Sequence, residues 1–403
     1  MKPRILFVMH YLEIGGAETA LIGLLNAIDY SRYDVDLFLH SHRGEMMAFV
    51  PKEVNLLPEI PVYAQIERPM KAVLKDGYIR MVAARMKAKM QTKRYLRRRS
   101  VKESAAGLQY TANAVTPMLP AINPTIEYDL AISFLQPHNI VRDKVRAKKK
   151  ACWIHTDYSV VDVNVADELP IWDAFDYVMS ISDDVTKTFL KTFPTLENKL
   201  VLMENILSPL FVRQRAGEFD ALTEYASYSK RAGGLSLFTI GRFTYQKNLE
   251  NIPDICNHII NLGISDIKWF IVGYGGDESL IHRKITEIGM EDHVFILGKK
   301  QNPYPYIKAC DIYVQPSRYE GKSVTVREAQ MLYKPVVVTN YPTASSQIKD
   351  GKDGVIVPLD NEGCARGIVD LINDKAKQEE IIEYLKIHDY GNETEVEKLY
   401  KLI

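Results

Sequence analysis

Short apolar runs alternate with amphipathic segments along the chain. Residues 5–9 are apolar, residues 17–28 carry apolar side chains at helical spacing, and residues 35–39 are apolar again. This order is the β-α-β rhythm of a parallel sheet. Further strand-like runs lie at 130–135, 151–154, 177–181, 200–203, 235–240, 267–272, 294–297, 312–315 and 335–339. Because these strands are almost continuously apolar, the pattern predicts an α/β protein whose sheets are covered by helices on both faces.

The rhythm lapses in a mixed polar stretch near the middle of the chain. We expect a linker at 208–234, between a first Rossmann-like domain at 1–207 and a second at 235–378. Residues 379–403 end in a helical pattern with no strand after it, which predicts a C-terminal helical tail. Doubly wound sheets bind ligands at the carboxyl ends of their strands, and two facing sheets form a cleft.

The composition agrees with two ordinary globular domains. The chain has 403 residues, of which 46% are hydrophobic and 25% charged, which argues against disorder and a disulfide-stapled scaffold. The 51 Lys and Arg balance 51 Asp and Glu, so no global field attracts nucleic acid. Four widely spaced Cys indicate a reducing compartment and no structural metal. No apolar run approaches the about 18 residues of a membrane span, and we expect a cytoplasmic protein.

One segment breaks the charge balance. Residues 68–102 contain 13 Lys or Arg against Asp76 alone, a net charge of +12 that the rest of the chain offsets. Apolar residues are interleaved with these charges, as in a basic amphipathic helix. Docking to an anionic membrane surface, on the inner face of the cell membrane, is one interpretation. A solvated helical face or mobile insertion is another, and nucleic-acid binding is a third, weakened by the scarcity of aromatic residues.

Two turns after predicted strands contain residues suited to anionic or sugar ligands. Gly15 and Gly16 precede a predicted helix, where the backbone can approach a phosphate or sugar hydroxyl, although a simple turn explains them equally well. Gly241 follows the strand at 235–240 and is succeeded by Arg242 and Lys247. These two cations could neutralise a diphosphate at the edge of the sheet, or face solvent at its rim.

Two further loops in the second half also follow strands. Residues 273–278 resemble a glycine-rich nucleotide turn but lack its third glycine and basic partner, which favours a tight connector. Residues 317–330 form the strongest candidate, because they lead from a strand into a helix that begins near Ser323. Glu320 and Glu328 stand eight residues apart, up to roughly 12 Å in a helix. This separation suits the sugar and the ribose of a nucleotide-sugar.

These motifs, in their order and spacing, resemble the retaining glycosyltransferases of family 4, which have the GT-B fold of two facing Rossmann-like domains. The resemblance covers most of the chain. It is carried by the segments 15–18, 241–248, 272–275, 311–328 and 335–338. Lys322, Tyr333-Lys334 and the segment 340–347 depart from the family pattern, which leaves the identity of the donor sugar open.

The resemblance implies roles for individual residues. Arg242 and Lys247 would bind the donor diphosphate, with Gly241 beside them, and Glu328 would bind the ribose. Glu320 and the amides of Gly321, Lys322 and Ser323 would bind the transferred sugar. The base would lie near Gly298 and Lys299, at the end of the strand at 294–297. Gly15 and Gly16 of the first domain would approach the donor. His155 would line the reaction centre, although a lone histidine after a strand is more often structural.

The expected activity is transfer of a sugar from a nucleoside-diphosphate sugar, with UDP favoured as the nucleotide, to a hydroxyl of a lipid-linked or surface polysaccharide. Cations and a helix N-terminus could stabilise the leaving diphosphate without a metal or cofactor. By family likeness the anomeric configuration would be retained. A sugar-nucleotide epimerase of the same architecture is one alternative. A non-catalytic adaptor that binds membranes or nucleic acid is another.

Overall fold

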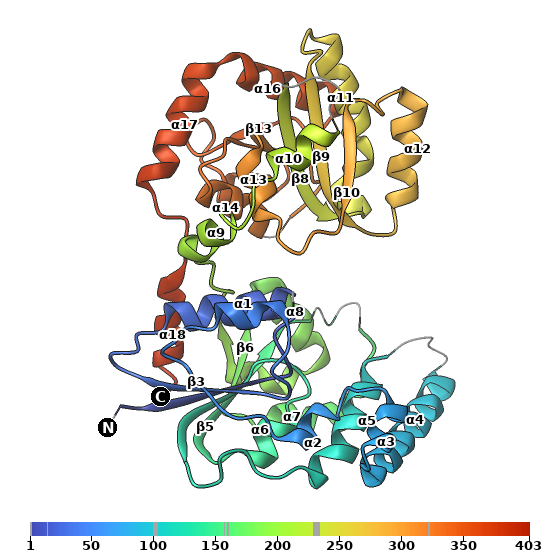
Figure 1. Cartoon of the computed structure of the whole chain (residues 1–403), viewed down its shortest axis with the longest axis vertical. Coiled ribbons are helices and arrows are strands. Elements are labelled where there is room, and N and C mark those ends of the chain that lie inside the picture. Colours follow the sequence, from blue (N-terminus) through green and yellow to red (C-terminus); the bar gives the residue numbers. More distant parts are fainter. Residues whose placement is uncertain are drawn as a thin grey trace. The chain divides into compact units, whose positions relative to one another are not determined.

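The computed structural model describes residues 2–13, 15–99, 104–156, 158, 161–228, 234–320 and 323–403. The chain forms two compact units, each built around its own sheet (Figure 1). Unit 1 comprises Met1–Ile206 and Asn392–Ile403, and unit 2 comprises Leu207–Gly391. No helix in these described ranges is both long and apolar enough to cross a membrane.

Unit 1 contains a seven-stranded parallel sheet in the order β3-β2-β1-β4-β5-β6-β7. Its strands are β1 (Arg4–Met9), β2 (Asp34–Leu39), β3 (Asn55–Leu56), β4 (Tyr128–Ser133), β5 (Ala147–Ile154), β6 (Tyr177–Ser180) and β7 (Leu200–Leu202). Its helices are α1 (Gly16–Ala27), α2 (Pro61–Ala64), α3 (Met70–Lys75), α4 (Ile79–Arg99), α5 (Ala106–Val115), α6 (Asn139–Lys144), α7 (Val165–Asp173), α8 (Asp183–Thr192) and α18 (Val396–Tyr400). The strands predicted in this half are confirmed to within a few residues.

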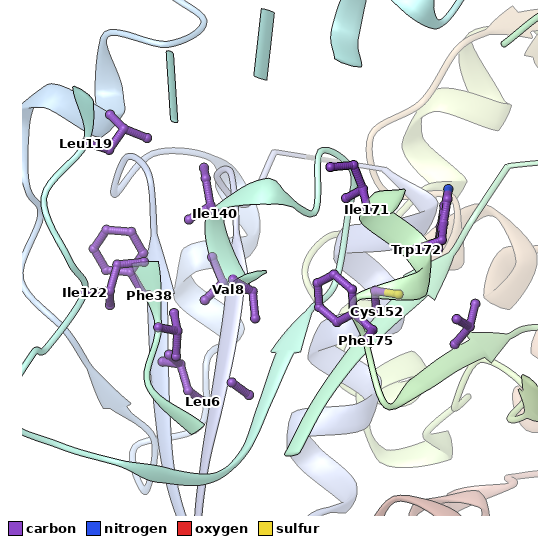
Figure 2. Packing of buried hydrophobic residues seen from close by; sticks show 14 of the residues in the cluster. Leu6, Val8, Phe38, Leu119, Ile122, Ile140, Cys152, Ile171, Trp172 and Phe175 are labelled. Carbon is purple, nitrogen blue, oxygen red and sulfur yellow. The ribbon is translucent and has the colours of Figure 1, made fainter. Parts of the chain in front are cut away.

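Apolar side chains pack on both faces of this sheet. Leu6 and Val8 of β1 face a cluster that includes Ile140 of α6 and Trp172 of α7 (Figure 2). The intervening strand residue Phe7 points to the opposite face and is also fully buried. Burial of a large apolar side chain stabilises the fold by about 1.5–3 kcal/mol. Burial of alternate residues on both faces explains why strands such as β1 are almost continuously apolar in sequence.

The basic segment is helical, as predicted. Helices α3, α4 and α5 lie together beside the unit 1 sheet (Figure 1). Met81 and Ala88 of α4 are buried on one helical face, and Tyr95 on the same face donates a hydrogen bond of 3.1 Å to the carbonyl oxygen of Val163. The last three residues of the segment, including Lys102, lie outside the described residues.

Unit 2 contains a six-stranded parallel sheet in the order β10-β9-β8-β11-β12-β13. Its strands are β8 (Leu235–Arg242), β9 (Ile267–Tyr274), β10 (Val294–Gly298), β11 (Ile312–Gln315), β12 (Val336–Thr339) and β13 (Val355–Val357). Its helices are α9 (Pro209–Arg215), α10 (Leu222–Ser227), α11 (Ile252–Asn261), α12 (Glu278–Ile288), α13 (Tyr304–Ala309), α14 (Val324–Met331), α15 (Ala344–Gln347), α16 (Asn361–Asn373) and α17 (Lys375–Ile387). Of these strands, β13 is the one that the sequence pattern did not predict.

The segment 208–234 is not the linker that the sequence predicts, because α9 and α10 within it pack as part of unit 2. The ring of Tyr225 stacks on Phe270 with centroids 3.9 Å apart, and its hydroxyl donates a hydrogen bond of 2.9 Å to the carbonyl oxygen of Tyr306. Residues 229–233 lie outside the described residues. A few aromatic residues hold the segment against unit 2. They are too widely spaced to produce a periodic pattern in the sequence.

The expected tail at 379–403 also differs from the structure. Its proposed start lies inside α17, which belongs to unit 2, whereas residues 392–403 belong to unit 1. Tyr400 stacks on Tyr33 with ring centroids 4.3 Å apart, and its hydroxyl accepts a hydrogen bond of 2.7 Å from the backbone N–H of Asp29. The chain therefore returns to its first unit through contacts between residues more than 360 positions apart.

Candidate functional site

The loops that follow β8 and β11 are joined by hydrogen bonds. These strands are neighbours in a parallel sheet, so their carboxyl ends lie at the same edge. The backbone N–H of Arg318 donates to the carbonyl oxygen of Gln246 at 2.9 Å, and the side chain of Gln246 donates to the carbonyl oxygen of Tyr319 at 3.1 Å. The side-chain amide of Asn248 donates to the carbonyl oxygen of Pro316 at 2.9 Å. These bonds hold the loop after β8 and the loop after β11 side by side.

Lys247 and Glu320 form an ion pair between these two loops. The Lys247 Nζ lies 2.6 Å from Oε1 of Glu320, whose side chain is only 5% exposed. Ser317 Oγ and Gln315 Nε2 also donate to Oε1, at 2.6 and 3.2 Å. No described residue donates to the second oxygen, Oε2, so it remains able to accept a hydrogen bond from a ligand hydroxyl. The sequence motifs predict both residues in one site but do not indicate their direct contact.

Arg242 is the last residue of β8 and is exposed, with no ion pair to any described residue. Gly273 allows the backbones of β8 and β9 to approach each other here. A Cβ at Gly273 of β9 would lie 1.9 Å from the carbonyl oxygen of Gly241, and a Cβ at Gly241 would contact Lys247 Cγ at 3.4 Å. Gly273 is therefore needed for close approach of strand ends, in keeping with the tight connector expected there.

Glu328 is buried in α14 beside a tyrosine that sequence analysis did not identify. Tyr304 Oη of α13 donates a hydrogen bond of 2.8 Å to Glu328 Oε1. Burial raises the pKa of the Glu328 carboxyl to about 7, although the hydrogen bond from Tyr304 acts in the opposite direction. Nothing in the spacing of residues 304 and 328 signals this contact, because it depends on the packing of two helices.

Ser323 is the N-cap residue of α14, and its backbone groups are already paired. Its N–H donates to Gln347 Oε1 at 3.1 Å, and its carbonyl oxygen accepts from Gln347 Nε2 at 2.6 Å. The amide of Ser323 that the resemblance assigned to the sugar is thus engaged by Gln347, in the segment that departs from the family pattern. Gly321 and Lys322 lie outside the described residues.

Gly298 is the last residue of β10 and Lys299 follows it, so both stand at the same edge of the parallel sheet. Gly298 has a left-handed backbone with φ of 72°, a conformation that favours glycine. The Lys299 ammonium lies 5.3 Å from the ring centroid of Tyr274, a ring that is 51% exposed. The described residues predicted in unit 2 therefore lie at or after the carboxyl ends of β8, β10 and β11 and in α14 with its N-cap, and β9 separates β10 from β8 in the sheet.

The predicted residues of unit 1 lie at the carboxyl ends of β1 and β5. Gly15 is the N-cap residue of α1, and a Cβ there would lie 2.2 Å from Glu18 Oε2, whereas a Cβ at Gly16 would meet nothing within 4 Å. Gly15 thus makes room for the side chain of Glu18. Burial raises the pKa of this carboxyl.

His155 directly follows β5 and borders a small pocket whose other lining residues include Gln136 and Tyr158. Burial lowers the pKa of its imidazole to about 4, so the ring is neutral near pH 7. Its Nε2 is buried without a hydrogen-bond partner among the described residues. A buried and unpaired ring nitrogen at a pocket can accept or donate a hydrogen bond to a ligand.

A buried polar network that sequence analysis missed forms a wall of this pocket. Gln136 Nε2 donates to Tyr158 Oη at 2.8 Å, and Tyr158 Oη donates to Glu168 Oε2 at 3.3 Å. Trp172 Nε1 donates to the same carboxylate oxygen at 3.4 Å. Burial raises the pKa of Glu168. These residues come from β4, β5 and α7 and their adjoining loops, so no local motif could reveal them.

Comparison with known proteins gives a family match in unit 2. Residues 224–388 match the family model of glycosyl transferases group 1. Among curated relatives, a lipopolysaccharide core biosynthesis glycosyltransferase of Rhizobium meliloti, LpsE, is 23% identical over 148 residues, or 36% of this chain and 42% of the relative. A UDP-Gal:α-D-GlcNAc-diphosphoundecaprenol α-1,3-galactosyltransferase of Escherichia coli is 29% identical over 139 residues, or 34% of this chain and 36% of the relative. The matches thus span less than half of each relative.

Solved structures resemble the chain over almost its full length. Anabaena HepE, in complex with UDP and glucose, has a TM-score of 0.59 at 16% identity, with 98% of each chain covered. Staphylococcus aureus TarM has a TM-score of 0.63 at 12% identity, with 100% of this chain and 99% of that chain covered. At such low identities the likeness concerns the fold.

Proposed function

We propose that this protein transfers a sugar from a nucleoside-diphosphate sugar to a hydroxyl group. The premise is that residues 224–388 match the glycosyl transferases group 1 within a chain of GT-B fold. The observation that carries the proposal is the constellation of Arg242, Lys247 and Glu320 at the adjoining ends of β8 and β11. It combines two cations with a carboxylate oxygen that no described residue engages. Such a set suits a ligand that carries both a diphosphate and sugar hydroxyls.

The ion pair between Lys247 and Glu320 is compatible with donor binding. An ammonium group has three hydrogen-bond donors, so Lys247 can contact Glu320 and a phosphate oxygen together. Glu320 then fixes the position of the Lys247 ammonium before the donor binds, and its Oε2 accepts a hydrogen bond from a hydroxyl of the sugar. Arg242 supplies the second cation, and Glu328 binds the ribose after its carboxyl loses its proton. This preorganised positive charge would stabilise the diphosphate as it leaves.

We further propose that the reaction retains the anomeric configuration and needs no metal ion at the diphosphate. The acceptor oxygen forms a bond to the anomeric carbon on the face from which the diphosphate departs, and the bond between that carbon and the diphosphate oxygen breaks. The acceptor proton passes to the departing diphosphate. Arg242 and Lys247 provide the charge compensation that a divalent ion would otherwise provide. His155, neutral near pH 7, is proposed to contact the reacting sugar.

The names of related proteins suggest the donor and acceptor classes. UDP is bound in the HepE structure, and the E. coli relative is named for transfer from UDP-Gal to a diphosphoundecaprenol-linked sugar. A relative in Erwinia amylovora is named for amylovoran biosynthesis. We therefore propose a UDP-sugar donor and a lipid-linked or polysaccharide acceptor. The epimerase and adaptor alternatives have no comparable support.

A panel of UDP-, GDP- and ADP-sugars tests this proposal. We expect one UDP-sugar to stabilise the protein by about 2.7 kcal/mol at 100 times its dissociation constant and to undergo slow hydrolysis. Proton NMR of the released sugar should show the anomeric configuration of the donor. An inverted product would contradict retention alone, whereas the absence of stabilisation and turnover with every donor would contradict the glycosyltransferase assignment. Addition of EDTA should leave the rate unchanged.

Helix α4 supports a second proposal, that unit 1 docks on the cytoplasmic, anionic face of a membrane. Its outward face carries Ile79, Met86 and Met90, which are 67%, 54% and 66% exposed. Lys93 and Arg97 are exposed on the same helical face, since positions three, four and seven residues apart align along a helix. An exposed apolar row flanked by bases is typical of helices that lie in a membrane interface.

Three basic residues of the segment are committed to contacts within the protein. Arg68 pairs with Asp76 at 2.6 Å, Arg85 donates to the carbonyl oxygen of Arg68 at 2.7 Å, and Arg99 pairs with Asp162 at 3.3 Å. Variants of these residues would disturb the local fold as well as any docking. The exposed residues Arg94, Arg97 and Arg98 are therefore the appropriate targets.

Replacement of Arg94, Arg97 and Arg98 with glutamine should weaken binding to anionic vesicles. At about 1 kcal/mol per basic residue near the surface, the loss corresponds to an affinity about 100-fold lower in a sedimentation assay. The control replaces three exposed lysines from other parts of the chain, Lys308, Lys352 and Lys401, with glutamine. Equal binding by the two triple variants would contradict docking through α4. Donor hydrolysis should be unaffected in both.

A further inference from the structure

Two histidines stand side by side at the carboxyl ends of β1 and β2. The ladder between these strands continues past them, because the N–H of His40 donates to the carbonyl oxygen of Met9 at 3.1 Å and the N–H of Ser41 donates to that of His10 at 3.0 Å. The two imidazole rings stack with centroids 4.8 Å apart and planes inclined by 16°. Their positions are thus set by the backbone of two adjacent, hydrogen-bonded strands.

A carboxylate completes the cluster. Glu67, in the loop between α2 and α3, places Oε1 2.6 Å from Nδ1 of His10. One candidate ligand atom from each of His10, His40 and Glu67 lies within 4.8 Å of the others. Because Glu67 is on a loop and its side chain is 32% exposed, its carboxylate can shift more readily than the two rings.

Two ring nitrogens in the cluster lack hydrogen-bond partners. Nε2 of His10 and Nδ1 of His40 are buried and have no partner among the described residues, and His40 is only 4% exposed as a whole. Buried polar side-chain atoms are usually paired, so two neighbouring exceptions require an explanation. The contact between His10 Nδ1 and Glu67 Oε1 satisfies one nitrogen of one ring and leaves both exceptions unexplained.

We propose that His10, His40 and Glu67 bind one divalent transition-metal ion, for which Zn²⁺ is the fitting example. Two imidazoles and a carboxylate are suitable zinc ligands, and three protein ligands leave a fourth position open to water or to an oxygen of another molecule. With bonds of about 2.0–2.2 Å, tetrahedral ligands are roughly 3.4 Å apart. The present separations therefore require side-chain rotations and a small loop movement, with no change in the strands. The proposal does not depend on the glycosyltransferase assignment.

Zinc titration of the full chain tests the site directly. After treatment with a chelator and dialysis, isothermal calorimetry with ZnCl₂ should show one tight equivalent per chain. His40→Ala and His10→Ala should each weaken this binding by at least about 100-fold, since loss of a direct ligand exceeds the 10–100-fold effects of second-shell changes. Glu67→Gln should weaken it about tenfold or more. His282→Ala, which removes an exposed histidine of α12 in unit 2, is the matched control and should bind as the wild type does.

Cobalt substitution provides a readout independent of activity. Co²⁺ bound by the wild-type protein should give the intense visible absorption of a tetrahedral site, and this absorption should be lost in His40→Ala. If His40→Ala does not fold, Glu67→Gln decides the matter, because its side chain lies on a surface loop. Absence of stoichiometric Zn²⁺ binding, or wild-type affinity in folded Glu67→Gln, would overturn the proposal.

Discussion

Replacing Lys247 with alanine is expected to lower kcat for sugar transfer by about 10²–10³-fold. The proposed reaction needs positive charge where the diphosphate leaves, and loss of one preorganised donor at such a position has effects of this size in other enzymes. Steady-state kinetics with the UDP-sugar selected by the donor panel would measure the change. A variant with near wild-type kcat would contradict the role of Lys247 in stabilising the leaving group.

The same substitution should also destabilise unit 2, because it removes the ammonium that pairs with Glu320 at 2.6 Å. Loss of one partner from a fully buried pair costs 3–5 kcal/mol. Lys247 is 20% exposed, and Glu320 retains two neutral donors, so we expect a loss of about 2 kcal/mol. Urea denaturation of the variant would measure it.

A double variant separates the two effects. Lys247→Ala combined with Glu320→Gln removes the unpaired charge, so it should recover most of the lost stability while remaining inactive. Lys199→Ala is the matched control, because it breaks a pair of 2.7 Å with Asp173, and both of these residues belong to unit 1. Lys199→Ala should keep normal kcat. Recovery of activity in the double variant would indicate that Lys247→Ala acts through stability alone.

Replacing Glu328 with glutamine is expected to stabilise the protein above pH 7 while it impairs donor binding. Burial raises the pKa of the Glu328 carboxyl from 4.5 to about 7. Between these pH values the folded state holds a proton that the unfolded state has released, so stability falls as the pH rises from about 4.5 to 7. At pH 8 the full cost of burying the charge applies, about 3 kcal/mol from the shift in pKa.

Glutamine carries no charge and can still accept the hydrogen bond from Tyr304. The gain in unfolding free energy of Glu328→Gln over the wild type should therefore be near zero at pH 4.5 and about 3 kcal/mol at pH 8. Glu250→Gln is a useful control, because Glu250 pairs with Arg318 at 2.7 Å, so its neutralisation should destabilise. An equal effect of Glu328→Gln at both pH values would contradict the shifted pKa.

The activity of Glu328→Gln should change in the opposite direction. A charged carboxylate accepts stronger hydrogen bonds from ribose hydroxyls than a neutral amide does, so KM for the donor should rise, by about tenfold. A variant that is both more stable and less active would show that the buried carboxyl is kept for function at the expense of stability. Unchanged KM would argue against the ribose role without affecting the stability prediction.

Much of the architecture could be predicted because it depends on local pattern. Almost continuously apolar strands such as 235–240 and 267–272 predicted a parallel sheet covered on both faces, and the order of motifs indicated the GT-B fold, which the structural comparisons confirm. The structure differs from the predicted linker and tail, because Tyr225 and Tyr400 hold these segments through ring contacts and hydrogen bonds with residues distant in sequence. Such contacts leave no periodicity in the sequence.

The amino-acid sequence by itself determined that Arg242, Lys247 and Glu320 stand at or after the ends of predicted strands of unit 2. Only the tertiary structure decided which of their atoms meet. It pairs Lys247 with one oxygen of Glu320, buries Glu328 against Tyr304, and stacks His10 on His40 across 30 positions of sequence. The physical reason is that strand identity follows from local hydrophobic pattern, whereas contacts at a sheet edge depend on strand order and register, which bring distant residues within hydrogen-bonding distance.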